Sequence, residues 1–178
     1  MNFNLLNALE RADMASISDR AERIEWLAKL EQPPVPFLND DIESLTLLNE
    51  AKNCFKRSLD IAAVLTATAY IEMTLADELR EAGNSKRKLP LGEMITEIRK
   101  IRVRNVVLSQ EFLDNLELLV KKRNAYAHRK EANDLDHTLG HRLITEQKHP
   151  RTVMREDAEL AMKLMYELFY RTLHSCPS

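Results

Sequence analysis

Residues 61–79 read IAAVLTATAYIEMTLADEL. At about 100° of rotation per residue, this stretch forms a helix whose apolar face consists of Ile61, Leu65, Ala69, Met73, Ala76 and Leu79. The rest of the chain also favours helices, because only three glycines and six prolines occur in 178 residues and 44% are hydrophobic. This length suits one hydrophobic core. We therefore predict an all-α fold, a single helical bundle.

The helical pattern around this stretch runs from Ile42 to Ala82. Asn39, Asp40 and Asp41 offer N-caps before it, and Gly83 and Asn84 end it. An unbroken helix of this length would measure on the order of 60 Å, which is long for a small domain. We therefore expect a break near residues 56–58.

The N-terminal part of the chain has a different pattern. Residues 2–31 predict one or two short amphipathic helices, with Ile24, Leu27 and Leu30 on one face and Trp26 beside it. Three prolines in residues 32–37 then stop the helical pattern and favour extended backbone. We predict an N-terminal helical extension and proline-rich linker over residues 1–38, followed by the bundle domain over residues 39–178.

Three further helices complete the predicted bundle. The first opens at Pro90 and turns inward Leu91, Met94, Ile95, Ile98 and Ile101. The second, from about Gln110 to Arg129, is capped by Ser109. The last begins near Glu156 or Asp157, after a polar loop, and is expected to bury Ala161, Leu164, Met165, Leu168 and Leu173.

Two charged residues fall on apolar helix faces. Arg123 shares a face with Phe112, Leu116, Leu119, Val120 and Ala127. Glu72 falls on the apolar face of residues 61–79. Because an unpaired buried charge costs several kcal/mol, we predict that the two side chains pair in the core, although either could instead extend to solvent at the edge of its face. For a buried pair, Glu72→Ala should cost on the order of 3 kcal/mol.

Asn124 and His128 lie four residues apart, near the polar margin of the same helix, so their side chains can touch. An amide that fixes an imidazole ring prepares it for general acid or base catalysis. A histidine at a helix end also serves as a C-terminal cap, which is the simpler interpretation. Arg123 and His128 diverge by about 140° around one helix, so two copies of the chain are expected to complete one phosphate-binding cleft.

Charge is distributed unevenly along the chain. Residues 1–85 hold 8 basic and 15 acidic groups, whereas residues 86–130 hold 12 basic and 5 acidic groups. A local basic excess of this kind can bind phosphates, although it can equally form solvated helix faces.

The string Lys121-Lys122-Arg123-Asn124-Ala125-Tyr126-Ala127-His128 resembles the signature of HEPN domains, in which an arginine and a polar residue precede a histidine. The order of helices over residues 42–174 is also similar to that family. The resemblance implies a homodimer in which the two motifs face each other, and metal-independent RNA cleavage in active members. Lys130 stands two residues after the histidine, where many toxin-type members carry tyrosine.

The resemblance also implies roles for residues. His128 would move a proton as a ribose 2′-OH attacks the adjacent phosphate, Arg123 would hold that phosphate, and Asn124 would position His128 or the phosphate. Glu72 and Tyr126 would support these three. The expected rim of the cleft, which would bind RNA, consists of Lys121, Lys122, Arg129 and Lys130. An antitoxin or regulatory protein is a further expected partner.

A second resemblance favours a non-catalytic role. Pro90-Leu91-Gly92-Glu93, followed by Val107-Leu108 and Phe112, is similar to the mannitol operon repressor family, whose members are helical regulators. The similarity covers mainly residues 60–128. It implies a transcriptional regulator or protein-interaction module instead of a nuclease.

Other site classes have little support. His137 and His141 could bind a metal with Asp134 or Asp136, but Gly140 interrupts the pattern and no third ligand is fixed, so we expect no metal and no cofactor. Cys54 and Cys176 stand far apart and predict reduced thiols. With no apolar run of about 20 residues and no leader pattern, we expect a cytoplasmic protein without membrane contact.

Overall fold

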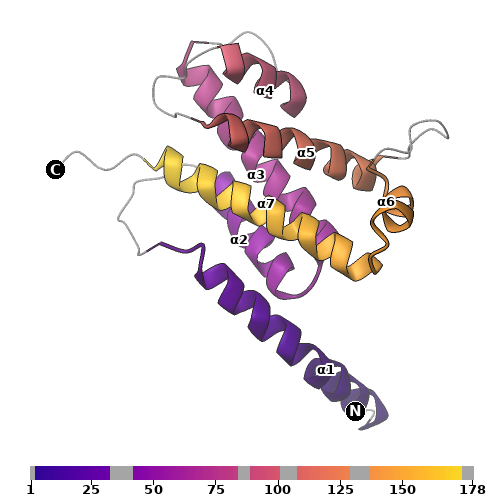
Figure 1. Cartoon of the computed structure of the whole chain (residues 1–178). Helices are drawn as coiled ribbons and strands as arrows, with labels where there is room; N and C mark the ends of the chain where they lie inside the picture. Colours follow the sequence, from indigo (N-terminus) through magenta and orange to yellow (C-terminus); the bar gives the residue numbers. More distant parts are fainter. Residues whose placement is uncertain (1–2, 33–41, 84–88, 101–107, 129–136, 174–178) are drawn as a thin grey trace.

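The computed structural model describes residues 3–32, 42–83, 89–100, 108–128 and 137–173. Across these ranges the chain forms seven helices and no strand, which confirms the predicted all-α bundle (Figure 1). The helices are α1 (Phe3–Ala28), α2 (Ile42–Lys56), α3 (Asp60–Glu81), α4 (Leu91–Lys100), α5 (Gln110–Ala127), α6 (Leu139–Glu146) and α7 (Pro150–Thr172). Within the described ranges, no helix combines the length and apolar character needed to cross a membrane.

Helix α3 is the centre of the bundle. It packs mainly against α2 and α7, and also contacts α4 and α5 (Figure 1). Its small residues Ala63 and Ala67 are fully buried, which allows the neighbouring helices to approach closely. Larger side chains fill the space between the helices, and the fully buried ones on α3 and its neighbours include Phe55, Ile71, Phe112, Leu116, Met162 and Met165.

The predicted apolar face of α3 was wrong by a partial rotation of the helix. Ile61 is exposed, and Leu65, Ala69, Met73 and Ala76 are only half-buried; of the predicted set, Leu79 alone is buried. The helix is apolar around most of its circumference, so periodicity did not select one face. Packing against α2 and α7 instead buries Ala63, Val64, Ala67, Thr68, Tyr70, Ile71 and Leu75.

The predicted break in the long helical pattern is confirmed. Helix α2 ends at Lys56 and α3 begins at Asp60, with Ser58 in the left-handed region at φ 59°. At the other end of α3, Gly83 follows the helix at φ 86°, a conformation that glycine adopts without a steric cost. The predicted N-caps at residues 39–41, and Asn84, lie outside the described residues.

The predictions for α4 and α5 are mostly confirmed. Helix α4 buries four of its predicted residues, and Ile101 lies outside the described residues. The Ser109 hydroxyl accepts a hydrogen bond from the Phe112 backbone N–H at 3.1 Å, as an N-cap should. Ala127 is exposed and not buried, because α5 ends there, at the surface.

Helices α6 and α7 correct two predictions. Residues 139–146, expected to be part of a polar loop, form α6, which is capped by the Thr138 side chain. Helix α7 begins at Pro150, about two turns before the predicted start, with the His149 side chain accepting a hydrogen bond from the Arg151 backbone N–H. Proline suits the first helical position, so this start has a local cause. The expected core residues of α7 are buried except Leu173, which is half-buried.

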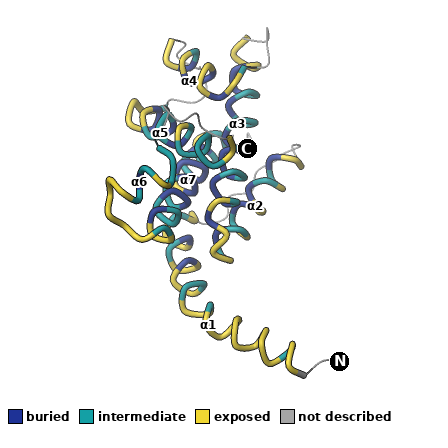
Figure 2. Tube along the Cα trace, turned by 90° about the vertical axis from the view of Figure 1, so that its right-hand side faces the viewer, coloured by how far each residue is buried: buried dark blue, intermediate teal, exposed yellow. Residues whose placement is uncertain are grey.

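Helix α1 is one continuous helix rather than two short ones, and it is anchored only at its C-terminal half. Figure 2 shows this contrast in burial along the helix. Leu27 is 2% exposed and Arg23 is 3% exposed, and the Trp26 ring packs on Phe55 with the ring centroids 5.1 Å apart. Ile24 was predicted to share the packed face with Leu27 but is 51% exposed, because the bundle covers the adjacent face.

Candidate functional site

The predicted motif lies at the C-terminal end of α5. Ala127 is the last helical residue, and His128 follows as the C-cap with extended backbone. The His128 backbone N–H donates to the Asn124 carbonyl oxygen at 3.0 Å. The His128 side chain is exposed. The imidazole is therefore presented to solvent at a helix end, where a ligand can approach it.

Arg123 pairs with Glu72, as predicted, where α3 and α5 pack together. The Arg123 Nη2 and Glu72 Oε2 atoms lie 3.7 Å apart. The prediction that this pair is buried was wrong, because the side chains are 32% and 33% exposed. Both charges sit at the margins of their helix faces, where water still reaches them, so the pair contributes little to stability.

Asn124 contacts Arg123 rather than His128. Its Oδ1 accepts a hydrogen bond from Arg123 Nη1 at 3.1 Å. A guanidinium has five N–H donors, so these two contacts leave donors for a further anion. We refer to Glu72, Arg123, Asn124 and His128 as the motif surface. In it, the arginine is oriented by its neighbours without being saturated by them.

The residue before Arg123 points elsewhere. Lys122 was predicted to bind RNA at the rim of the cleft, but its Nζ lies 2.6 Å from Asp157 Oδ1 on α7, and its side chain is only 13% exposed. Tyr126, expected to support the motif, donates its hydroxyl to Asp157 Oδ2 at 2.7 Å. Both residues leave α5 on the side that faces α7.

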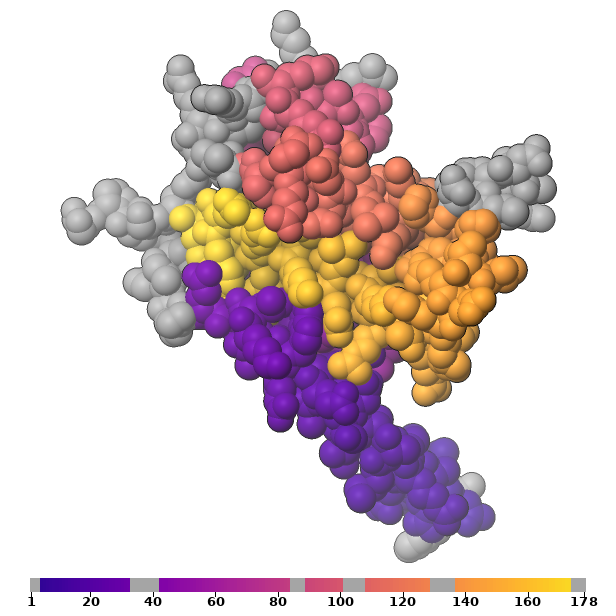
Figure 3. Space-filling model, viewed as in Figure 1, coloured from indigo at the N-terminus to yellow at the C-terminus, as the bar shows by residue number. Residues whose placement is uncertain are grey.

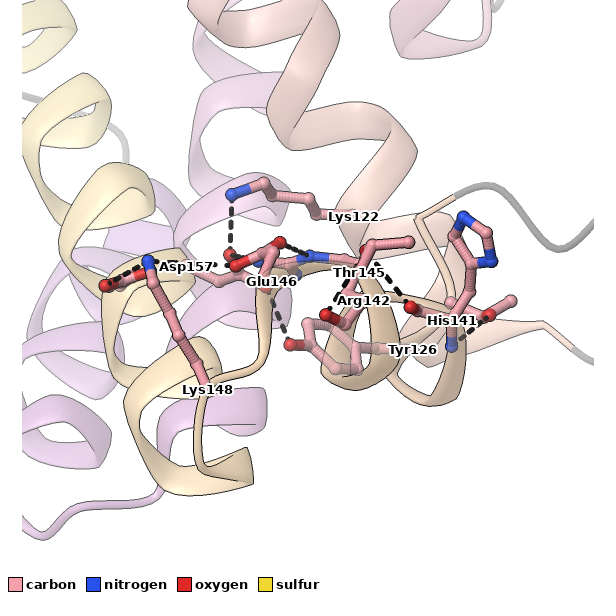
Figure 4. A network of polar contacts seen from close by, with 10 residues as sticks. Lys122, Tyr126, His141, Arg142, Thr145, Glu146, Lys148 and Asp157 are labelled. Carbon is pink, nitrogen blue, oxygen red and sulfur yellow. Dashed lines mark hydrogen bonds and ion pairs between the residues drawn. The ribbon is translucent and has the colours of Figure 1, made fainter.

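Asp157 is fully buried and collects four donors. Besides Lys122 and Tyr126, Arg142 on α6 donates Nη1 to Oδ2 at 2.5 Å and Nη2 to Oδ1 at 3.0 Å (Figure 4). Arg142 is itself buried and also donates Nε to Glu146 at 2.8 Å. We call these five residues the Asp157 network. It fastens α6 and the end of α5 to α7, and so holds the helix end that carries His128.

The electrostatics of this network follow from its burial and its donors. Burial by itself raises the pKa of Asp157, but the hydrogen bonds from Arg142, Lys122 and Tyr126 outweigh it and hold the pKa below its ordinary value. Burial, with the adjacent Asp157 carboxylate, raises the pKa of Tyr126. The carboxylate is therefore charged and the phenol neutral at physiological pH.

The basic residues predicted around the motif are dispersed. Lys121 is exposed, whereas Arg129 and Lys130 lie outside the described residues. Farther along the basic segment, Arg99 pairs with Asp114 and Glu117, and Lys100 pairs with Glu97. These ion pairs neutralise part of the local excess of positive charge. Among the four predicted rim residues, Lys121 is the one that the described residues show to be exposed.

The described residues do not support the alternative metal site considered at His137 and His141. His141 lies in the first turn of α6, and Asp134 and Asp136 lie outside the described residues. Over the described ranges, no three His, Cys, Asp or Glu side chains cluster in a metal-binding arrangement.

Comparisons of the chain with models of protein families, with curated proteins and with solved structures returned no match.

Proposed function

We propose that the protein is a HEPN-like, metal-independent endoribonuclease that acts as a homodimer, of the toxin, phage-defence or stress type. The observation that carries the proposal is the partial exposure of Arg123 together with its contacts to Glu72 and Asn124. Its guanidinium is 32% exposed, is oriented by Glu72 and Asn124, and stands within five residues of the exposed His128. A phosphate ester needs a fixed cation with free donors and a nearby group that moves protons.

The proposed reaction is attack by a ribose 2′-OH on the adjacent phosphate. The new bond joins the 2′-oxygen to phosphorus, the bond to the 5′-oxygen breaks, and a 2′,3′-cyclic phosphate and a 5′-hydroxyl remain. His128 moves the proton: its imidazole takes the proton from the 2′-hydroxyl and gives it to the leaving 5′-oxygen. Arg123 stabilises the charge that develops on the phosphate. Asn124 positions Arg123, since its side-chain oxygen accepts from that guanidinium.

The proposal of a homodimer rests on the spacing of Arg123 and His128 in the chain. A spacing of five residues corresponds to about 140° around a regular helix, and His128 lies one residue beyond the end of α5, so we do not expect one chain to direct both groups at one phosphate. In a two-fold contact, the histidine of one copy approaches the arginine of the other, which makes one composite cleft. Lys121 then contributes positive charge from both copies, and Arg129 and Lys130 follow the motif directly in the sequence.

RNA cleavage in the presence of EDTA tests this proposal. Purified protein incubated with labelled RNA should give products ending in 2′,3′-cyclic phosphate, and His128→Ala should abolish them. Because His128 is exposed, the free energy of unfolding of this variant should differ from that of the wild type by no more than about 0.5 kcal/mol. A loss of cleavage would then reflect lost chemistry and not a lost fold. Absence of turnover on varied RNAs would reject the nuclease.

The second candidate is a non-catalytic regulator or interaction module, similar to the mannitol operon repressor family. It is favoured by the engagement of the motif helix within its own chain: Lys122 and Tyr126 are committed to Asp157, and Arg123 already has two acceptors. In this case the wild type and His128→Ala would bind the same partner with equal affinity, and neither would cleave RNA.

A further inference from the structure

The N-terminal half of α1 lies outside the bundle. Figure 3 shows α1 in indigo extending away from the body, and its N-terminal part is exposed along its length in Figure 2. Large apolar side chains nevertheless occur on it, and the exposed ones on α1 are Leu5 (59%), Leu9 (55%), Met14 (71%), Ile17 (48%) and Ile24 (51%). A projecting helix with this many exposed apolar side chains indicates a contact with another molecule.

Five residues of α1 form one stripe: Leu9, Asp13, Ile17, Arg20 and Ile24. Their spacings of four, four, three and four residues keep them within about 80° of each other around the helix. The stripe is centred about 100° from the side that turns Asp19 and Arg23 toward the bundle. It is therefore open to a partner while α1 stays anchored to its own chain.

We propose that this stripe pairs, antiparallel, with the same stripe of a second copy of the chain. The sequence of the stripe is complementary to its own reverse. When Asp13 is placed opposite Arg20 of the partner subunit, Leu9 comes opposite Ile24 of the partner subunit, and Ile17 lies beside the two-fold axis. A parallel pairing would instead set like charges against each other, which is unfavourable.

The charges on the stripe have weak partners within one chain. Arg20 Nη2 lies 3.7 Å from Asp13 Oδ1, and these side chains are 36% and 74% exposed. An ion pair this open contributes little in a single chain. In the antiparallel pair, each charge gains a partner across the interface, flanked by Leu9 and Ile24. A polar pair within an apolar seam fixes orientation and register, as it does in coiled coils.

The contact is limited in size. From Leu9 to Ile24 the stripe extends about 23 Å, and two helices meeting over this length bury less than a standard stable interface. We therefore expect association in the micromolar range that weakens at high salt. The stripe contains none of the motif residues, so it stands independently of the proposed nuclease and of the dimer contact proposed at the motif.

Charge reversal tests the register. In sedimentation at matched ionic strength, Asp13→Arg and Arg20→Asp should each weaken the α1-dependent association at least ten-fold, because four like charges then meet. The double variant Asp13→Arg with Arg20→Asp restores opposite charges and should recover association to within about three-fold of the wild type. Equal association of all four proteins, or failure of the double variant to recover, would overturn the antiparallel pairing.

Disulfide trapping tests the axis independently of any contact at the motif. In a full-length background with Cys54→Ser and Cys176→Ser, Ile17→Cys should form a disulfide-linked pair under mild oxidation, because its position beside the axis brings the two copies close enough. The matched control is Ser18→Cys, which is also exposed but lies about 100° farther around the helix. We expect at least a ten-fold faster reaction at position 17, and equal rates would overturn the proposal.

Discussion

Lys122 and Arg123 are consecutive in the chain but belong to two regions that use charge differently. In the Asp157 network, a fully buried carboxylate accepts four hydrogen bonds from three side chains. On the motif surface, Glu72 is a third exposed and meets Arg123 only at 3.7 Å. A substitution in the network is costly because each buried charge there needs its partner. On the motif surface, by contrast, the Arg123 guanidinium is oriented by its neighbours and still accessible to solvent. The buried charge of Asp157 holds helices together, whereas the partly exposed charge of Arg123 keeps hydrogen-bond donors available to a ligand.

Removing the charge of Asp157 should have the largest effect. Asp157→Asn leaves the buried Arg142 with Glu146, which is 31% exposed, as its counter-ion, and removes the buried partner of Lys122 as well. We expect the free energy of unfolding to fall by about 3–5 kcal/mol in urea denaturation. The matched control is Glu156→Gln on the same helix, whose partner Lys148 and own side chain are each 42% exposed. That variant should lose less than about 1 kcal/mol. Similar losses in the two variants would show that the network is not the structural anchor.

Comparing the two adjacent lysines should separate structure from binding. Lys122→Met removes one donor from Asp157 and should destabilise the fold by about 1–2 kcal/mol. Lys121→Met should change stability by no more than about 0.5 kcal/mol. If RNA binds at the motif surface, Lys121→Met should also reduce the slope of log affinity against log salt concentration by about one per chain. Equal unfolding midpoints would contradict the division between the two residues.

Acid should weaken the Asp157 network in a predictable direction. The folded-state pKa of Asp157 lies below the unfolded value of about 3.9, so its stabilisation is complete above that pH and is lost as the pH falls through the folded pKa. The stability difference between the wild type and Asp157→Asn should therefore shrink below about pH 4. Unfolding midpoints measured from pH 2 to pH 6 check this, and a constant difference would count against it.

Truncating Glu72 should have a much smaller effect on stability than removing the charge of Asp157. A buried pair would make Glu72→Ala cost on the order of 3 kcal/mol, but the observed exposure of both partners lowers the expected cost to less than about 1 kcal/mol. Urea denaturation distinguishes the two values. A loss near the larger value would mean that Arg123 depends on Glu72 as strongly as Arg142 depends on Asp157.

Periodicity in the sequence predicted some of these contacts and missed others for identifiable reasons. The pairing of Glu72 with Arg123 could be predicted, because both fall near apolar faces of helices. Their burial could not, since α3 is apolar around most of its circumference and its rotation depends on packing. The positions of Arg129 and Lys130 stay predictions, because those residues lie outside the described ranges.

Asp157 was missed because the start of α7 was placed too late. With a start near residue 156, an aspartate resembles an ordinary first-turn acid. With the observed start at Pro150, Asp157 falls in line with the buried Val153, Ala161, Leu164 and Leu168. A carboxylate on that face needs partners, and the same reasoning that found Glu72 would have found it. Pro150 was the available signal, because proline favours the first position of a helix.

The anchorage of α1 has a consequence for synthesis of the chain. Asp19 accepts a hydrogen bond from Arg155, which is 136 residues later in the sequence, and the Gln32 backbone N–H donates to the Tyr170 hydroxyl, 138 residues later. At about 5–20 residues per second, a ribosome needs on the order of 10 s to add the missing partners. During that interval α1 can already pack on α2, where the Trp26 ring lies against Phe55, but its hydrogen bonds with α7 cannot form. The first helix made therefore gains part of its contacts early, from α2, and completes them only after the last helix has emerged.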